Sequence, residues 1–274
     1  MRIIMIRFIG SDIDGTILKK PWDTLPDELF ELIHFFTSKG VLFTVASGRQ
    51  YANLRNMFKS VADEVAFITE NGALVYYHDE EIHKCVMDHE KAVELSNLIQ
   101  SLDGYDVQVS VPGYYYMNMK EEPFKHEVLS LPGMTYRTCS DYREITEDIV
   151  KVAMYHFGGV DEKLCEDMAR EWGKYFTCVR SQKTWFDFIP PEANKGLATK
   201  AILDRFGIDR KDAYAFGDNY NDKEMLEYVG HGYIMDIAVP ELKAQFENVT
   251  DDTMREFRKL KDEILKAESG SLRT

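Results

Sequence analysis

Two carboxylates, Asp12 and Asp14, stand two residues apart after an apolar run, and Gly15 and Thr16 follow them. Their charges would crowd each other at a strand end, and one group would be pushed towards protonation unless a cation lay nearby. Mg²⁺ would remove that conflict, because it prefers few protein oxygens together with phosphate and water. Gly15 would permit a tight turn that aims both side chains at one place. The alternative is a solvated turn rich in Asp and Gly, while a calcium loop fits poorly because no Glu closes it.

Two further segments carry groups that suit phosphate. Ser47, Gly48 and Arg49 follow an apolar run, and a hydroxyl with free amides at a strand-to-helix junction can bind a phosphate oxygen. Lys195 opens a helical stretch, where positive charge is mildly unfavourable, so a bound phosphate is one reason for its position. The alternatives are a serine helix cap in the first segment and an ordinary surface lysine in the second.

A fourth polar segment follows the apolar run Ala213–Gly217 and contains Asp218, Asn221 and Asp222. Acidic residues directly after a buried strand fit a metal site, although Asn221 or Asp222 could instead cap the following helix. In an open parallel sheet, ligands bind at the carboxyl ends of the strands. Each segment taken alone has an ordinary explanation. It is much harder to attribute to chance that all four are predicted at the same edge of one sheet.

The apolar patterns predict a parallel α/β sheet that would bring these segments together. Strands are predicted at 8–11, 41–46 and 65–69, with a helix at 26–39 and another ending near residue 59. The same pattern resumes after residue 191, with helices at 195–206, 221–229 and 252–266 and strands at 213–217 and 233–235. Alternation of strands and helices is typical of a parallel sheet covered on both faces.

Residues from about 80 to 190 differ and predict a separate α+β unit with a largely antiparallel sheet. Helices are expected at 88–101, 122–129 and 161–172, between aromatic, alternating segments at 114–119, 150–157 and 174–179. An insertion of this kind places the active site between the two units. Some side chains of these segments could face a substrate, but we expect them in the core of the inserted unit: Tyr114, Tyr115, Tyr116, Met154, Tyr155 and His156.

The composition is that of a globular protein, with 45% hydrophobic and 29% charged residues among 274. The formal net charge of -14 repels nucleic acid and anionic lipid, so neither is expected as a main partner. No segment has the length of apolar sequence that a membrane span needs. The opening to Gly10 is interrupted by Arg7 and lacks a signal-peptide cleavage site, so we expect a first strand and a cytoplasmic protein. The cysteines are widely spaced and are expected to be free thiols: Cys85, Cys139, Cys165 and Cys178.

Together the motifs resemble those of the haloacid dehalogenase superfamily of phosphohydrolases, specifically the Cof-type members with a large α/β cap. The matching segments come in the family's order over nearly the whole chain: Asp12-x-Asp14-Gly15-Thr16, Ser47-Gly48-Arg49, Lys195 in Asn-Lys-Gly, and Gly217-Asp218-x-x-Asn221-Asp222. Glu70-Asn71-Gly72-Ala73 also resembles the stretch that precedes the cap in these enzymes. Asp236-Ile237-Ala238 departs from the family's Gly-Asn-Ala, which would alter the loop near the metal site without removing a proposed ligand.

The resemblance implies a Mg²⁺-dependent phosphatase that acts on sugar phosphates or similar small metabolites through an aspartyl-phosphate. Asp12 would be the nucleophile, and Asp14 would protonate the leaving oxygen and later activate water. The phosphate-binding residues would be Thr16, Ser47, Gly48, Lys195 and Asn221. The metal would be bound by the Asp12 carboxylate, the Asp14 backbone carbonyl and Asp218, with Arg49 and Asp222 in support.

The implied fold is a Rossmann-like parallel-sheet core of residues 1–82 and 190–274, with an α+β cap inserted as residues 83–189. A phosphomutase and a non-catalytic metabolite-binding protein remain alternative functions on this fold. Isomerised product would mark the mutase, whereas the binding protein would be favoured if Asp12, Asp14, Lys195 or Asp218 were missing, and all of them are present. The expected partner is a small phosphoester, and the sequence gives neither its identity nor the oligomeric state.

Overall fold

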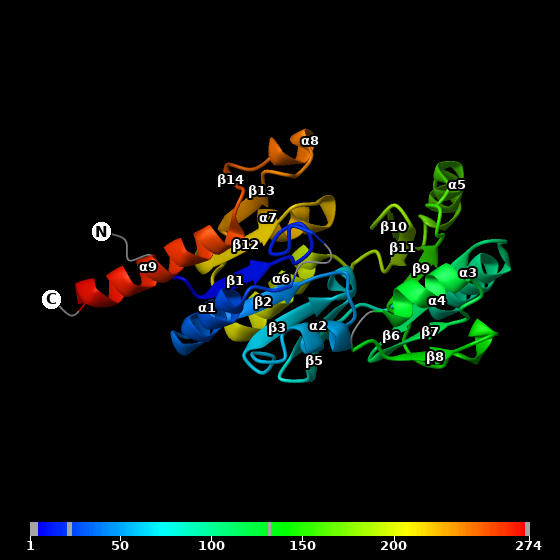
Figure 1. Cartoon of the computed structure of the whole chain (residues 1–274), viewed down its shortest axis with the longest axis horizontal. Helices are drawn as coiled ribbons and strands as arrows, with labels where there is room; N and C mark the ends of the chain where they lie inside the picture. The colour runs from blue at the N-terminus through cyan, green and yellow to red at the C-terminus, as the bar shows by residue number, and fades with distance from the viewer. Residues whose placement is uncertain (1–4, 21–23, 131–132, 272–274) are drawn as a thin grey trace.

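A computed structural model of the chain describes residues 5–20, 24–130 and 133–271. The strands of these residues form two sheets, which lie at opposite ends of the long axis of the molecule (Figure 1). The core sheet has the order β14-β13-β12-β1-β2-β3-β4-β5, and the cap sheet has the order β10-β11-β9-β6-β7-β8. The predicted fold class, a parallel-sheet core with an inserted α+β unit, is confirmed.

The core sheet is parallel from β14 to β3, and β4 and β5 extend it as an antiparallel hairpin. Its strands, in sheet order, are β14 (Asn248–Thr250), β13 (His231–Met235), β12 (Ala213–Gly217), β1 (Phe8–Ser11), β2 (Leu42–Ala46), β3 (Val65–Thr69), β4 (Leu74–Tyr77) and β5 (Glu80–Lys84). The hairpin was not predicted, because its strands are short and β5 is charged and partly exposed.

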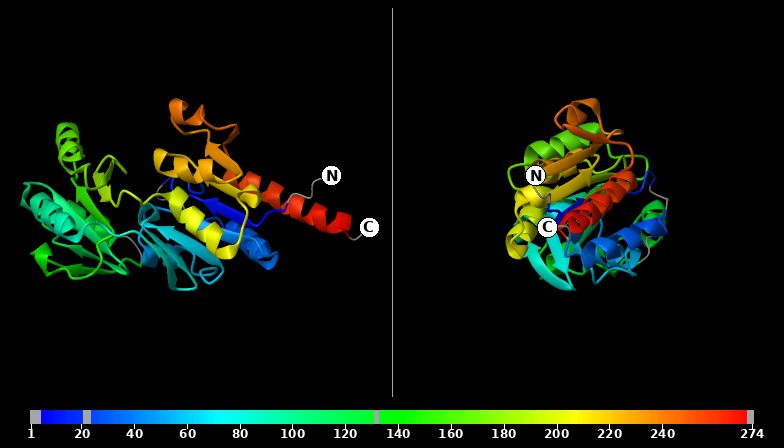
Figure 2. Two further views of the ribbon diagram at one scale, coloured as in Figure 1. Left: turned by 180° about the vertical axis from the view of Figure 1, so that it is seen from behind. Right: turned by 90° about the vertical axis from the view of Figure 1, so that its left-hand side faces the viewer.

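Helices cover both faces of the core sheet (Figures 1 and 2). On one face lie α1 (Asp27–Ser38), α2 (Tyr51–Met57) and α9 (Thr253–Ser271), and on the other α6 (Lys195–Phe206) and α7 (Lys223–Tyr228). The remaining short elements are η1 (Glu70–Gly72), η3 (Arg210–Asp212), η4 (Tyr220–Asp222) and α8 (Pro240–Lys243). The helix predicted over 221–229 is therefore η4 followed by α7, and the one predicted over 252–266 continues to Ser271 as α9.

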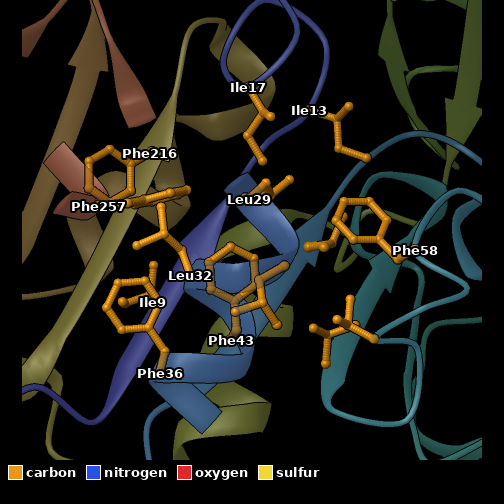
Figure 3. Close-up of a cluster of buried hydrophobic side chains, with 14 of the residues drawn as sticks. Ile9, Ile13, Ile17, Leu29, Leu32, Phe36, Phe43, Phe58, Phe216 and Phe257 are labelled. Carbon is orange, nitrogen blue, oxygen red and sulfur yellow. The ribbon is translucent and has the colours of Figure 1, made fainter. Parts of the chain in front are cut away.

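Aromatic rings fill the space between the core sheet and the layer formed by α1 and α9 (Figure 3). Phe36 of α1 stacks on Phe43 of β2 with ring centroids 6.4 Å apart, and Phe257 of α9 meets both rings edge-on. All three side chains are fully buried. The apolar stripe that predicted α1 is the face that packs here, so the periodicity of the sequence located both the helix and its contact.

The cap sheet is antiparallel except for the pairing of β7 with β8. Its strands are β6 (Asp106–Val111), β7 (Tyr114–Met117), β8 (Tyr136–Thr138), β9 (Lys151–Tyr155), β10 (Thr177–Val179) and β11 (Trp185–Ile189). One face packs against α3 (His89–Ser101) and α5 (Glu162–Trp172), with η2 (Tyr142–Glu144) beside them. The other face carries α4 (Glu122–Leu129) and the buried polar residues Ser110, Lys151 and Asp187, which contact η1 of the core.

The inserted unit was predicted in outline, and its strands were predicted incompletely. Tyr115, Met154 and Tyr155 are buried as expected, whereas Tyr114, Tyr116 and His156 are half-buried. The segment predicted over 174–179 contains only the short β10, and the cap strands β6, β8 and β11 were missed, as was β14 of the core sheet. β6 was missed although Asp106–Val111 alternates strictly between polar and apolar residues, the pattern typical of a strand, and its polar residues Asp106, Gln108 and Ser110 are buried as well.

All four cysteines lie in the described part of the chain and are free thiols, as predicted. Within that part no helix combines the length and the apolar character that crossing a membrane requires. The first four residues of the predicted opening strand lie outside the described residues, and β1 begins at Phe8.

We expect Phe36→Ala to lower the free energy of unfolding by about 3–5 kcal/mol, because it removes a fully buried ring that two other rings contact. Urea titration followed by circular dichroism measures the loss. Leu265→Ala is the matched control, since Leu265 lies on α9 with 43% of its surface exposed, and its effect should stay within about 0.5 kcal/mol. Equal losses in the two variants would contradict the packing described for α1.

Candidate active site

The register of the core sheet brings three of the predicted polar segments side by side. Ser11, the last residue of β1, pairs with Val45 on β2 and with Phe216 on β12. One residue further along each strand lie the carboxyl ends, so Asp12 is flanked by the segments that begin at Ser47 and Asp218. Asp12 also donates its backbone N–H to the carbonyl of Phe216, at 2.9 Å.

Lys195 lies at the centre of this edge and has no exposure to solvent. Its ammonium donates to Asp12 Oδ1 and to Asp222 Oδ1, at 2.6 Å each. Burial alone would lower the pKa of Lys195, but the two carboxylates outweigh it and the pKa is raised, so the side chain is charged. The two carboxylates that bind Lys195 explain why a cation stands at the first position of α6. Asn194 caps the helix, because its side-chain oxygen accepts the N–H of Leu197 at 2.8 Å.

Asp222 holds the loop after β12 in shape. Its Oδ2 accepts from the backbone N–H groups of Asp218 and Asn219, at 3.0 and 3.1 Å, while its Oδ1 binds Lys195. The carboxylate is fully buried and packs directly on Gly217, where a β-carbon would overlap it. Asp222 therefore both neutralises Lys195 and fixes the direction in which Asp218 points.

The turn after β1 closes against the same loop. Gly15 has φ of +92°, and a β-carbon there would overlap the carboxylate of Asp218. Thr16 is buried and donates its hydroxyl to Asp218 Oδ1 at 3.0 Å. The sequence predicted the tight turn, and the structure shows that glycine is needed there for the close approach of Asp218 as well as for the backbone angle.

Within the described residues, oxygen atoms of Asp12, Asp218 and Asp222 lie within 4.8 Å of one another. Burial raises the pKa of Asp12 well above its usual range, and Asp222 and Asp218 add to this effect while Lys195 opposes it. Burial and the charge of Asp222 raise the pKa of Asp218 to about 6. Crowded, partly buried carboxylates of this kind fit a hard divalent cation, because its charge would relieve their repulsion.

Asp14 is not among the three clustered carboxylates and instead binds Arg49. The guanidinium donates from Nε to Asp14 Oδ2 at 2.9 Å and from Nη2 to Asp14 Oδ1 at 2.8 Å. Arg49 also donates to Asn53 Oδ1 at 3.3 Å. About a third of the Asp14 side chain is exposed, so the carboxylate is accessible from the space outside the sheet edge. This two-point pairing was not predicted, although both residues were singled out.

The segment after β2 is tied to η1. The Ser47 hydroxyl accepts the backbone N–H of Arg49 at 3.2 Å, and the Ser47 carbonyl accepts the N–H of Asn71 at 3.2 Å. Asn71 has φ of +59°, which asparagine tolerates better than most residues, and its side chain lies against Gly48. Its Oδ1 accepts from Asn221 Nδ2 at 3.2 Å. Asn71 thus connects two of the predicted phosphate-binding segments, a role that its place in an Asn-Gly turn did not indicate.

The predicted catalytic, phosphate-binding and metal-binding residues therefore lie along one edge of the core sheet, but they form distinct groups. Lys195, Asp12, Asp218 and Asp222 make the buried charged centre, and Thr16 is engaged with it. Asp14 and Arg49 form a pair beside it, and Ser47, Gly48 and Asn221 are joined through Asn71.

The sequence and the fold are both similar to those of known hydrolases. A sequence model described as haloacid dehalogenase-like hydrolase matches residues 9–256. The HMP-PP phosphatase of Cronobacter sakazakii is 27% identical over 252 residues, which cover 89% of this chain and 89% of that protein. A haloacid dehalogenase-like hydrolase from Bacteroides thetaiotaomicron has the same fold, with a TM-score of 0.81 at 19% identity over 93% of this chain and 99% of the other. The subclass IIB sugar phosphatase BT4131 has a TM-score of 0.76 at 20% identity, over 93% and 98% of the two chains.

We expect Mg²⁺ to raise the unfolding temperature more at about pH 7.5 than at about pH 5.5. The folded-state pKa of Asp218 is raised to about 6, so protonation of this group stabilises the metal-free protein as the pH falls through that value. That stabilisation is lost at higher pH, where the ionised carboxylates bind the metal without displacing a proton. Thermal unfolding with Mg²⁺ and with chelator measures the difference. Asp218→Asn should respond weakly at both pH values, and an equal response of both proteins would contradict the site.

Proposed function

The chain belongs to the haloacid dehalogenase-like hydrolase family, and on that premise we propose that it is a Mg²⁺-dependent phosphatase of small phosphorylated metabolites. One observation carries the proposal. The Asp12 carboxylate stands at the end of β1 between a buried ammonium and a second carboxylate that fits a metal ion. A nucleophile needs one oxygen held in place and the other directed at the substrate, and Lys195 holds Oδ1.

We assign Asp12 as the nucleophile. One carboxylate oxygen would attack phosphorus while the bond to the leaving oxygen breaks, which gives an aspartyl-phosphate that water then hydrolyses. Lys195 keeps the geometry of the carboxylate and compensates part of the negative charge that an incoming phosphate brings. Asp12, Asp218 and the Asp14 backbone carbonyl would bind Mg²⁺. The metal would neutralise more of the phosphate charge and reduce the repulsion between the phosphate and the Asp12 carboxylate.

Asp14 is assigned as the general acid and base. Its carboxylate lies two residues from Asp12 on the same turn, and its exposure lets it reach a leaving group outside the sheet edge. Arg49 holds both of its oxygens in the structure, which sets the direction of the carboxylate. Protonation of the leaving oxygen therefore requires that Arg49 shift or share Asp14, and an arriving phosphate is a suitable new partner for the guanidinium.

The phosphoryl oxygens would be bound by Ser47, the amides around Gly48, Asn221 and Lys195. Phosphoryl transfer depends mainly on positioning and on charge neutralisation, and these groups supply both. Thr16 already donates its hydroxyl to Asp218, so in this state its contribution is to position that carboxylate. Asp222 supports the site through Lys195 and the two loop amides.

The substrate class follows from the cap and from the relatives. We propose that residues 1–82 and 190–274 form the catalytic core and that residues 83–189 form the cap, so that a leaving group binds between them. The named relatives act as an HMP-PP phosphatase and as a sugar phosphatase, which supports small phosphorylated metabolites as the class. The net charge of -14 disfavours nucleic acid and anionic membranes as partners, and we place the protein in the cytoplasm.

We expect phosphate release from a panel of small phosphoesters to require Mg²⁺ and to fall at least about 10³-fold in Asp12→Asn. The amide keeps the shape of the side chain but lacks the nucleophilic charge. The panel would hold hexose phosphates, nucleotides, pyridoxal phosphate and flavin mononucleotide, each assayed with Mg²⁺ and with chelator. Asp262→Asn on the exposed face of α9 is the matched control and should retain full activity.

Near-normal turnover by Asp12→Asn would rule out the nucleophilic mechanism. Isomerised product in place of free phosphate would indicate a mutase. Absence of both products across the panel would favour a metabolite-binding protein.

A further inference from the structure

The cap contacts the segment that follows β2 through a buried lysine. Lys151 is the first residue of β9 in the cap sheet, and only 4% of its surface is exposed. Its ammonium donates to the backbone carbonyl of Gly48 at 3.1 Å and forms an ion pair with Glu70 of η1. A cap residue therefore binds directly to the backbone of the proposed phosphate-binding segment, 103 residues away in the sequence.

The charge of Lys151 is fixed by the groups around it. Burial alone would lower its pKa, but Glu70 and Asp187 face it and raise the pKa, so the ammonium keeps its proton. Both carboxylates are buried. Glu70 also accepts from Ser110 Oγ at 3.4 Å, and Asp187 accepts from Asn71 Nδ2 at 3.5 Å. Lys151 is held between cap and core by partners from both, so it takes this position only when the cap lies against the core.

The Gly48 carbonyl controls a group that matters for phosphate binding. A peptide unit is planar, so fixing the carbonyl of Gly48 fixes the N–H of Arg49 on the opposite side of the same plane. That N–H donates to the Ser47 hydroxyl, and the Arg49 side chain binds Asp14. Without a partner for its carbonyl, a peptide that follows glycine has wide rotational freedom.

A second contact joins the cap to the next residue of the segment. The Gln50 side-chain amide donates to the carbonyl of Thr135 and accepts the N–H of Thr135, at 3.1 Å each. Gln50 is almost fully buried, and Gly133 packs closely on Ala52 and Asn56 of α2. The cap thus contacts both sides of Arg49, through the Gly48 carbonyl on one side and the Gln50 side chain on the other.

We propose that Lys151 is a positioning residue through which the cap sets the geometry of the phosphate-binding segment Ser47–Arg49. The inference rests on the proposed function, because it assumes that this segment binds the phosphoryl group. Cap closure then does more than cover the substrate: it fixes the Gly48–Arg49 peptide and, through it, the Ser47 hydroxyl and the Arg49 side chain. The affinity for inorganic phosphate, which has no leaving group, should therefore depend on Lys151, because Ser47 and Arg49 would bind the phosphoryl group itself.

The test compares Lys151→Met with Lys151→Gln. Methionine fills the space without a donor, whereas glutamine can still donate to the Gly48 carbonyl without carrying charge. The probe is inorganic phosphate, measured as a competitive inhibitor of p-nitrophenyl phosphate hydrolysis in Mg²⁺, together with kcat and KM. We expect Lys151→Met to weaken phosphate inhibition about tenfold or more and to lower kcat/KM by a similar factor, and Lys151→Gln to recover most of both.

Lys84→Met is the matched control. Lys84 of β5 forms ion pairs with Asp148 at 2.8 Å and with Glu81 at 3.4 Å, and among the described residues neither of these partners belongs to the segment Ser47–Arg49. This variant should keep the phosphate affinity and turnover of the wild type. If Lys151→Met does not fold, the double variant Lys151→Met/Glu70→Gln removes both charges of the buried ion pair. Its phosphate inhibition and kcat/KM are then compared with those of Lys151→Gln/Glu70→Gln.

Wild-type phosphate inhibition in Lys151→Met would overturn the proposal, as would equal losses in the methionine and glutamine variants, which would mean that only the buried charge matters. These outcomes are distinct from a failure of the proposed function. In that case the wild type itself would neither release phosphate nor be inhibited by it.

Discussion

The arrangement of the core-sheet edge depends on one buried cation between two carboxylates. Taking charged groups out of water costs several kcal/mol per ion, and only close pairing with further hydrogen bonds offsets it. Lys195 meets this condition through Asp12 and Asp222, and Asp222 gains two backbone amides as well. Any movement of β1, α6 or the loop after β12 would leave a charge buried without its partner. The polar centre is therefore as constrained as the aromatic core beneath it.

A similar arrangement occurs at the contact between cap and core, where Lys151 lies between Glu70 and Asp187. The two lysines differ in what they join. The described partners of Lys195, Asp12 and Asp222, both belong to the core, whereas the groups around Lys151 come from both units. Under the proposed function, the first arrangement would hold the nucleophile in place permanently. The second would make the proposed phosphate-binding segment sensitive to the position of the cap, which would suit an enzyme that admits and releases a substrate between the two units.

The sequence was sufficient for features that arise from local chemistry. The stripe of α1, the run of β12 and the cation at the start of α6 each carried a local signal, and the rule that ligands bind at strand ends placed Asp12, Ser47 and Asp218 together. The pairings were less predictable. The Asp14–Arg49 pair depends on side-chain directions, and Lys151 appeared only as part of an alternating cap strand. Its partners Gly48 and Glu70 are far away in sequence, and no local pattern encodes which buried lysine meets which carbonyl.

The position of β1 in the middle of the core sheet has a consequence for synthesis of the chain. β1 pairs with β2 on one side and with β12, residues 213–217, on the other. At about 5–20 residues per second, a ribosome needs roughly 10–40 s between these neighbours. For most of that interval Asp12 lacks both Lys195 and the loop after β12. The described strands of the cap pair only with one another, and the last of them, β11, ends at Ile189, before β12 is made. The cap can therefore fold on the nascent chain before the core sheet is complete. Until β12 is synthesised, β1 can pair only with β2.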